Sequence, residues 1–185
     1  MSLLYIRTAK TGGSTTENWF YTNAKTTANA YLLSNEINKK IIKDAIESNF
    51  FIFTTVRNPF TRAISQWQQA IRSNWLKPNS FFEDFFEFNY KKNEVLITHC
   101  GTLYEVLNPY LDNINKFIKI ENFKKEIEYF RDKFKLPKKF CGHLNKGNYS
   151  IDLKSFYTKK RIDLVASKYD LDFKTFKYSR DVNDF

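Results

Sequence analysis

Short apolar runs alternate with segments of helical spacing along most of the chain. Four runs predict strands: LLYIRT, NAYLL, FFIFTTV at residues 50–56, and INKFIKI. The third run is almost continuously apolar or β-branched, which is typical of a strand buried on both faces of a parallel sheet. Because segments that predict helices separate the strands, the pattern predicts an α/β fold with a mainly parallel sheet flanked by helices.

The predicted helices cover STTENWFYTNA, SNEINKKIIKDAIES, the segment after Asn58-Pro59, FFEDFFEFNY, ENFKKEIEYFRDKF and part of the C-terminal region. Asn58 can cap the third of these helices, and Pro59 suits its first position, where the missing N–H costs nothing. The buried stripe of that helix is expected to contain Ala63, Ile64, Trp67 and Ile71.

The composition is that of a folded chain, with 42% apolar and 18% aromatic residues among 185. This length suits one domain with a sizeable core, so a single domain over residues 1–185 is expected. No run approaches the roughly 18 apolar residues that span a bilayer, and the N-terminus lacks a basic signal region. A soluble, cytoplasmic protein without a membrane partner is therefore expected.

The formal charge of +10 favours an anionic partner such as a nucleotide, a nucleic acid or an acidic glycan. A lysine-rich, solvated surface explains the same charge equally well, because net charge speaks to association and not to a site.

The first candidate site is the loop AKTGGSTT after the first strand. Gly12 and Gly13 allow close approach of the backbone, the following hydroxyl residues begin a helix, and Lys10 adds a positive charge, which together form an oxyanion cradle. A plain Gly-Gly turn beside an exposed lysine is the alternative. A Walker loop is excluded, because there the lysine follows the second glycine.

The second candidate site follows the third strand. Arg57 ends that strand and Ser65 lies in the next helix, and an arginine fork with a hydroxyl can hold a phosphate. A surface ion pair and an ordinary helical serine are the alternatives.

Together the two segments resemble the sulfotransferases that use 3′-phosphoadenosine 5′-phosphosulfate (PAPS), and the nearer branch looks like the carbohydrate sulfotransferases. AKTGGSTT is similar to the family's 5′-phosphosulfate loop, and TTVRNPFTRAISQW to its 3′-phosphate motif. The second match is the more specific. Weaker similarities in HCGTLYEVL, FIKIENF, HLNKGNYS and YDLDFKTFKY extend the resemblance over most of the chain. The resemblance implies a P-loop-like sulfotransferase fold.

This resemblance implies transfer of a sulfuryl group from PAPS to a hydroxyl or amine, on a carbohydrate or another small polar acceptor. It assigns Lys10 to charge stabilisation, and the backbone N–H groups of Thr11, Gly12, Gly13, Ser14 and Thr15, with the hydroxyls of the last two, to the 5′ end. Arg57 and Ser65 match the 3′-phosphate pair, whereas Arg62 is expected to brace the helix or loop, with direct contact to the ligand as the alternative. A late loop corresponding to CGHLNKG offers Asn145 and Lys146 to the 3′-phosphate or adenine side.

The general base stays undecided between two residues. Glu36 stands where the family places a His or Glu after the second strand, and His99 lies in a segment that resembles an acceptor-side histidine. A dipole-favoured surface glutamate and a structural histidine are the alternatives.

No metal is expected. His99-Cys100 and Cys141-Gly142-His143 offer nitrogen and sulfur ligands, but their spacing does not match a zinc site. Reduced thiols are the simpler expectation for both cysteines.

Two other functions stay open from sequence alone. One is a nucleotide-dependent phosphotransferase with the same strand, loop and helix. The other is a basic nucleic-acid-binding domain, although no known RNA-binding motif is present and a nucleic-acid partner is not expected.

Overall fold

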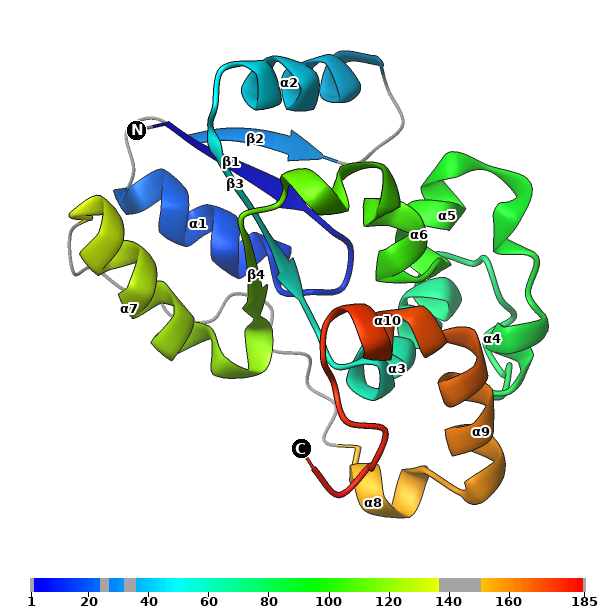
Figure 1. The fold of residues 1–185 in the computed structure, drawn as a ribbon. Coiled ribbons are helices and arrows are strands. Elements are labelled where there is room, and N and C mark those ends of the chain that lie inside the picture. Colours follow the sequence, from blue (N-terminus) through cyan, green and yellow to red (C-terminus); the bar gives the residue numbers. More distant parts are fainter. Residues whose placement is uncertain (1, 24–26, 32–35, 137–150, 185) are drawn as a thin grey trace. The chain divides into compact units, whose positions relative to one another are not determined.

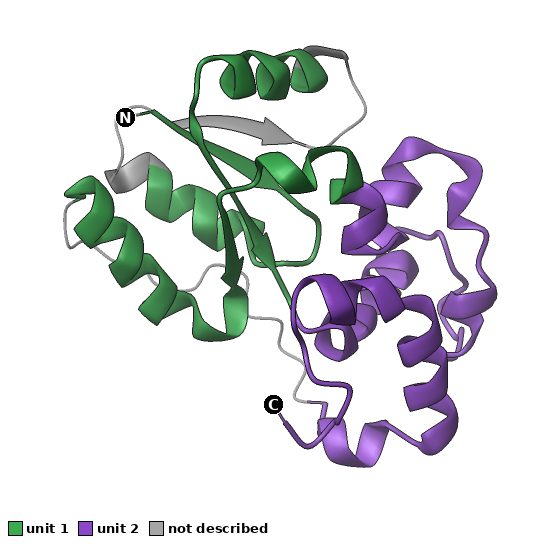
Figure 2. Cartoon of the chain, viewed as in Figure 1, with its two compact units in different colours: residues 1–57, 107–146 green, residues 58–106, 147–185 purple. Residues whose placement is uncertain are grey.

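The computed structural model describes residues 2–23, 27–31, 36–136 and 151–184, and the chain divides into two compact units (Figure 2). Unit 1 contains Met1–Arg57 and Leu107–Lys146. Unit 2 contains Asn58–Val106 and Gly147–Phe185. Each unit has its own core, and the expectation of a single domain over the whole chain stays a prediction.

Unit 1 is built on a four-stranded parallel sheet in the order β2-β1-β3-β4 (Figure 1). The strands are β1 (Leu3–Arg7), β2 (Thr27–Tyr31), β3 (Phe51–Val56) and β4 (Lys116–Lys119). All four correspond to the apolar runs, so the predicted α/β class with a parallel sheet is confirmed.

Helices cover both faces of this sheet (Figure 1): α1 (Gly13–Asn23) and α7 (Phe123–Phe134) lie on one face and α2 (Glu36–Glu47) on the other. An aromatic cluster holds the first face together, because the ring of Phe53 lies 4.5 Å from that of Phe20 and 4.7 Å from that of Phe130. Successive strand residues point to opposite faces, so Tyr5 joins this cluster while Leu4 is buried on the side of α2.

Unit 2 is helical among its described residues. Its helices are α3 (Pro59–Arg72), α4 (Asp84–Glu87), η1 (Tyr90–Lys92), α5 (Glu94–Cys100), α6 (Leu103–Leu107, ending at the first residue of the next segment of unit 1), α8 (Leu153–Phe156), α9 (Lys159–Lys168) and α10 (Asp170–Thr175). The 3-10 turns η2 (Asn108–Asn113) and η3 (Ile120–Asn122) belong to unit 1.

The start of α3 follows the sequence prediction. The side chain of Asn58 accepts a hydrogen bond from the backbone N–H of Phe60 at 2.9 Å, and Pro59 occupies the first turn. The asparagine thereby satisfies one of the N–H groups that a helix leaves unpaired at its start.

The predicted buried stripe of α3 is correct only in part. Ala63 and Ile64 are buried, whereas Trp67 and Ile71 are half-buried. Arg62 and Gln66 are fully buried instead, because unit 2 offers them polar partners. Arg62 Nη1 donates to Gly101 O at 2.9 Å and lies 3.8 Å from Asp172 Oδ2. Gln66 Oε1 accepts a hydrogen bond from the Tyr169 hydroxyl at 2.5 Å. Arg62 therefore braces the helix, as expected.

The helix predicted over FFEDFFEFNY is shorter than expected. It is limited to α4 and the turn η1, since Phe88 adopts an extended conformation at ψ 123°. Aromatic side chains are modest helix formers, and here Phe82 and Phe85 are anchored by burial rather than by a continuous helix. Among the described helices, none is long and apolar enough to cross a membrane.

Candidate functional site

The loop between β1 and α1 lies at the carboxyl end of the sheet in unit 1. The chain leaves β1 for β2 on one side, while β3 pairs with β1 on the other, so the strand order reverses between β1 and β3. In open parallel sheets a ligand binds outside the carboxyl ends of the strands at such a point. The fold thus places Lys10 and Arg57, which follow β1 and β3, at this edge.

The backbone of this loop contains two residues in the left-handed region. Lys10 has φ 65° and Gly12 has φ 78°. At Gly12 a β-carbon would lie 2.5 Å from Ile120 Cδ1, so both the conformation and the space require glycine. The lysine has no such freedom, and a non-glycine residue in this region costs roughly 1–2 kcal/mol, which the surrounding contacts must offset.

The first turn of α1 can receive an anion. It consists of Gly13, Ser14, Thr15 and Thr16, all uncharged, and the first helical bond runs from the Thr16 N–H to Gly12 O at 3.1 Å. The N–H groups before Thr16 have no helical carbonyl to bind, and the helix dipole makes this end positive. An oxyanion is therefore favoured here without any further charge.

Hydroxyl groups under the loop form a buried network. Thr11 Oγ1 lies 2.9 Å from Thr8 Oγ1 and 2.9 Å from Thr55 Oγ1, and Thr8 Oγ1 donates to Thr55 O at 2.8 Å. The Tyr5 hydroxyl lies 2.8 Å from Thr55 Oγ1, and burial raises the pKa of Tyr5 to about 12, so this hydroxyl keeps its proton. The Thr11 hydroxyl thus holds the loop on β3.

Arg57 connects the end of β3 to the loop. Its Nη1 donates to the carbonyl oxygen of Lys10 at 3.4 Å, and the side chain is half-buried. The guanidinium therefore lies beside the loop that carries Lys10, and a guanidinium is a group that binds phosphate through more than one N–H.

Arg7, at the end of β1, contacts the first turns of α1. Its Nη1 lies 2.6 Å from Glu17 Oε2, its Nη2 donates to Ser14 Oγ at 3.2 Å, and its Nε lies 2.7 Å from where a β-carbon of Gly13 would stand. Gly13 is thus needed for close packing of this side chain. The Ser14 hydroxyl is half-buried, and Thr15 is 4% exposed.

Several predicted site residues lie in unit 2 or outside the described residues. Ser65 is half-buried on α3. His99 is half-buried on α5, where its ring centroid lies 5.6 Å from that of Trp75 and its carbonyl accepts from Gln66 Nε2 at 2.9 Å. Their roles stay predictions.

Three other candidate residues lie partly or wholly outside the described part of the structure. Glu36 is the first residue of α2, but its side chain lies outside the described part of the structure, so the choice of general base between it and His99 stays open. Asn145 and Lys146 also lie outside the described residues.

The cysteine and histidine residues whose spacing speaks against a zinc site are only partly described. Cys100 is a buried free thiol whose pKa burial raises to about 11, whereas Cys141 and His143 lie outside the described residues. Among the residues that are described, no three His, Cys, Asp or Glu side chains are grouped as metal ligands.

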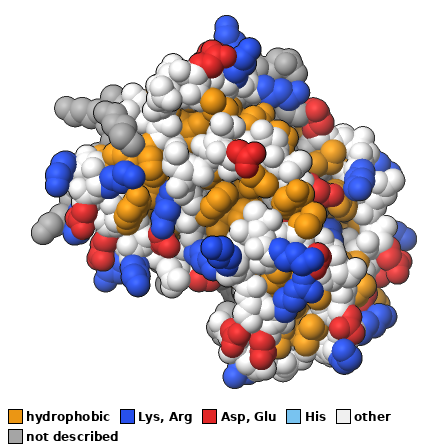
Figure 3. All heavy atoms as spheres, viewed as in Figure 1, with side chains coloured by type: hydrophobic (Ala, Val, Ile, Leu, Met, Phe, Trp, Pro, Cys, Tyr) orange, Lys and Arg blue, Asp and Glu red, His pale blue; other side chains and the backbone are white. Residues whose placement is uncertain are grey.

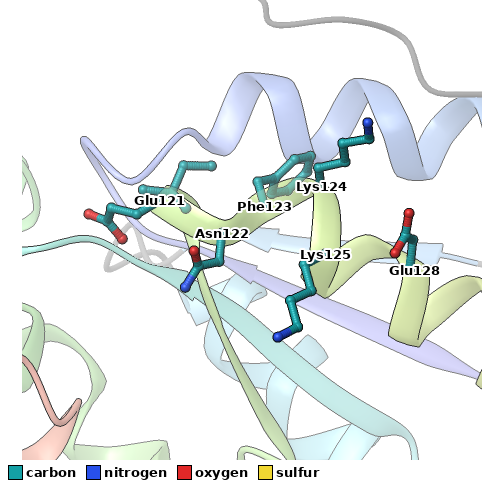
Figure 4. Close-up of a pocket in the computed structure, with 7 residues that line it drawn as sticks. Glu121, Asn122, Phe123, Lys124, Lys125 and Glu128 are labelled. Atoms are coloured by element: carbon teal, nitrogen blue, oxygen red, sulfur yellow. The ribbon is translucent and has the colours of Figure 1, made fainter. Parts of the chain in front are cut away.

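A hollow of about 480 Å³ opens at the start of α7 (Figure 4). Its lining comprises Ile120, Glu121, Asn122, Phe123, Lys124, Lys125 and Glu128. Figure 4 shows Lys124 and Lys125 pointing away from each other, and Glu121 and Glu128 add negative charge. The hollow therefore lacks the converging cations that an anion requires, and its relevance to the loop is limited to Ile120, which packs against Gly12.

Comparison with known proteins identifies the class that this fold and loop define. The profile of the sulfotransferase family matches residues 1–179, and the chain belongs to that family. The predicted enzyme class is thereby confirmed at family level, whereas the carbohydrate branch is not. A search of curated proteins found no match.

A solved structure shares the fold. The crystal structure of mouse sulfotransferase SULT7A1 complexed with PAP is similar with a TM-score of 0.60 at 14% sequence identity, over 96% of this chain and 89% of that one. At this identity the similarity concerns the fold, and it confirms the predicted sulfotransferase-like architecture.

Sequence reasoning missed four residues that support the loop and the start of α1: Arg7, Glu17, Thr55 and Ile120. A signal was present for Arg7, because a charged residue that continues the alternation of Leu3 and Tyr5 points to the same face as α1. The contacts of Thr55 and Ile120 with the loop join residues distant in sequence, so no local pattern could reveal them.

Proposed function

We propose that the protein transfers a sulfuryl group from PAPS to a hydroxyl or amine of a small polar acceptor, with a saccharide as the favoured class. The observation that carries this proposal is the loop after β1, where Lys10, a first helical turn without charge and the Arg57 guanidinium gather in a member of the sulfotransferase family. The PAP bound to mouse SULT7A1 supports PAPS as the co-substrate.

Each loop residue then has a role. Lys10 neutralises the charge that builds on the leaving 5′-phosphate and the transferred group, and the backbone N–H groups of Thr11 to Thr15 hold the 5′ end. Arg57 binds the 3′-phosphate. Ser65 is assigned to the same phosphate from the family resemblance alone. The resemblance is also the sole basis for placing Asn145 and Lys146 at the 3′-phosphate or adenine side.

The reaction needs positioning and charge neutralisation more than covalent catalysis. The acceptor oxygen or nitrogen attacks sulfur in line, the bond from sulfur to the phosphate oxygen breaks, and 3′-phosphoadenosine 5′-phosphate (PAP) leaves. A general base, Glu36 or His99, takes the acceptor proton. No step requires a metal.

The charge of the chain supports an anionic acceptor such as an acidic saccharide. Of its residues, 30 are Lys or Arg and 20 are Asp or Glu. On the face drawn in Figure 3 the two signs are interspersed, which offers no continuous basic stripe in that view for a nucleic-acid backbone.

The decisive experiment is incubation of the purified protein with PAPS and a panel of neutral and acidic oligosaccharides. Release of PAP that depends on one class of acceptor is expected. Calorimetry should show that PAP binds more tightly than ADP, and without magnesium. Absence of PAP binding would sink the proposal. Magnesium-dependent ATP binding would instead favour a phosphotransferase, and RNA affinity that falls steeply with salt a nucleic-acid-binding domain.

A further inference from the structure

An ion pair that no step of sulfuryl transfer requires joins the end of β1 to helix α1, on either side of the loop between them. Arg7 ends β1 and Glu17 begins the second turn of α1, and Arg7 Nη1 lies 2.6 Å from Glu17 Oε2. The side chains are 29% and 10% exposed, so the pair is largely withdrawn from water. Buried ion pairs contribute little net stability, because desolvation offsets their attraction, and a role in fixing geometry is the better explanation.

The contacts of Arg7 show what geometry is fixed. Its guanidinium reaches two positions of α1, since Nη1 pairs with Glu17 and Nη2 donates to Ser14 Oγ at 3.2 Å. Its Cγ lies 2.9 Å from where a β-carbon of Gly13 would stand. Arg7 therefore contacts the first residue, the first turn and the second turn of the helix whose N–H groups face the proposed 5′-phosphosulfate.

The charge of Glu17 is as necessary as that of Arg7. A lone cation at the start of a helix opposes the helix dipole and would itself attract the incoming anion. Glu17 neutralises Arg7, so the anion is left to Lys10 and the backbone N–H groups. This arrangement has a cost, because Glu17 Oε1 is buried without a hydrogen-bond partner among the described residues.

We infer that Arg7, held by Glu17, is a positioning residue that sets the start of α1 for the 5′ end of the nucleotide. This inference rests on the proposed function. The pair contacts the loop at Gly13 and Ser14, next to Gly12 and close to Lys10, whose left-handed conformations must be maintained by their surroundings. When either charge is lost, the first turn of α1 relaxes and its N–H groups no longer converge.

The test compares two ligands that differ only at the 5′ end. Adenosine 3′,5′-bisphosphate carries a 5′-phosphate and adenosine 3′-monophosphate does not. In the Glu17→Gln variant, affinity for the bisphosphate should fall at least about fivefold by calorimetry, while affinity for the 3′-monophosphate stays unchanged. A general loss of structure would weaken both ligands together.

Controls separate this role from stability. Glu126→Gln removes a matched pair elsewhere in unit 1, because Lys116 Nζ lies 2.7 Å from Glu126 Oε2 and these side chains are 30% and 20% exposed. It should leave the affinity for both ligands unchanged. If Glu17→Gln fails to fold, Arg7→Lys is the second variant, because lysine keeps the charge but cannot contact Glu17 and Ser14 through two separate nitrogen atoms. Arg7→Lys should show the same selective loss of affinity for the bisphosphate, and its kcat should fall more than its KM rises.

Two different results would count against these claims. A wild-type protein that binds neither ligand would overturn the proposed function. A wild-type protein that binds both, with variants that lose both equally or neither, would overturn the positioning role alone.

Discussion

Arg57 Nη1 donates to the carbonyl oxygen of Lys10 at 3.4 Å, which ties the end of β3 to the loop after β1. Residues 47 positions apart in sequence are thus direct neighbours in the part of the sheet where the strand order reverses. In the proposed reaction Lys10 acts at the 5′ end of the nucleotide, and Arg57 binds its 3′-phosphate. Variants at the two positions therefore test the two ends of the proposed nucleotide site separately.

Lys10→Ala should impair turnover much more than folding. Removing one cation that stabilises a transition state typically lowers kcat by about 10²–10³-fold. The backbone at this position is left-handed, with φ 65°, so Lys10→Gly is the matched variant, which loses the same charge but gains backbone freedom. Both variants should be equally inactive in PAP release, while Lys10→Gly unfolds at the higher urea concentration. Wild-type turnover in either variant would remove Lys10 from the mechanism.

Arg57→Lys should reduce the preference for nucleotides with a 3′-phosphate. An arginine fork can bind the phosphate through two N–H groups while a third group reaches Lys10 O, whereas lysine is a point charge. Calorimetry with PAP and AMP measures this preference as a ratio of affinities. The ratio should fall by about tenfold or more, with AMP affinity nearly constant. An equal loss for both nucleotides would show that Arg57 supports the loop and does not recognise the 3′-phosphate.

Local patterns predicted the fold well and the site only in part. The four strands and the Asn58 cap could be predicted from sequence, because alternation and capping act over a few residues. The cradle from Lys10 to Thr15 stays a prediction. The supports of that loop could not be predicted, since Ile120 reaches Gly12 from the end of β4. The prediction that Trp67 is buried was wrong for the same reason, since Trp67 is half-buried. Its neighbour Gln66 is buried instead, because Tyr169, which is distant in sequence, gives the Gln66 side chain a hydrogen-bond partner.

Gly12→Ala should destabilise the protein and disturb the loop. The added β-carbon meets Ile120 Cδ1 at 2.5 Å, and the residue must keep φ 78°. A loss of about 1–3 kcal/mol in the free energy of unfolding is expected from strain and overpacking together. Combining Gly12→Ala with Ile120→Ala should recover the part due to overpacking only, which a double-mutant cycle in urea measures. Strict additivity of the two changes would mean that Ile120 does not constrain the loop.

The stability of the protein should rise between pH 7 and 9 because of Lys168 in unit 2. The Lys168 ammonium lies 4.2 Å from the ring centroid of Phe85 and 4.4 Å from that of Tyr90, and among the described residues it has no hydrogen-bond partner. Burial lowers its pKa to about 8, below the ordinary 10.5. Above pH 8 the unfolded chain therefore binds the proton more strongly than the folded one, and stability increases with pH, by on the order of 1 kcal/mol over this window.

Lys168→Met tests this assignment, because methionine has a similar length and no charge. The variant should lack the rise from pH 7 to 9, because it has no group that titrates there. It should also be more stable than the wild type at pH 7, because it buries no charge. Urea unfolding at a series of pH values measures both the free energy of unfolding at pH 7 and its change between pH 7 and 9. The neighbouring Cys100 thiol acts in the opposite direction, since burial raises its pKa to about 11 and thereby lowers stability above pH 9, so the comparison is confined to lower pH. An identical pH dependence in the two proteins would exclude Lys168 as its source.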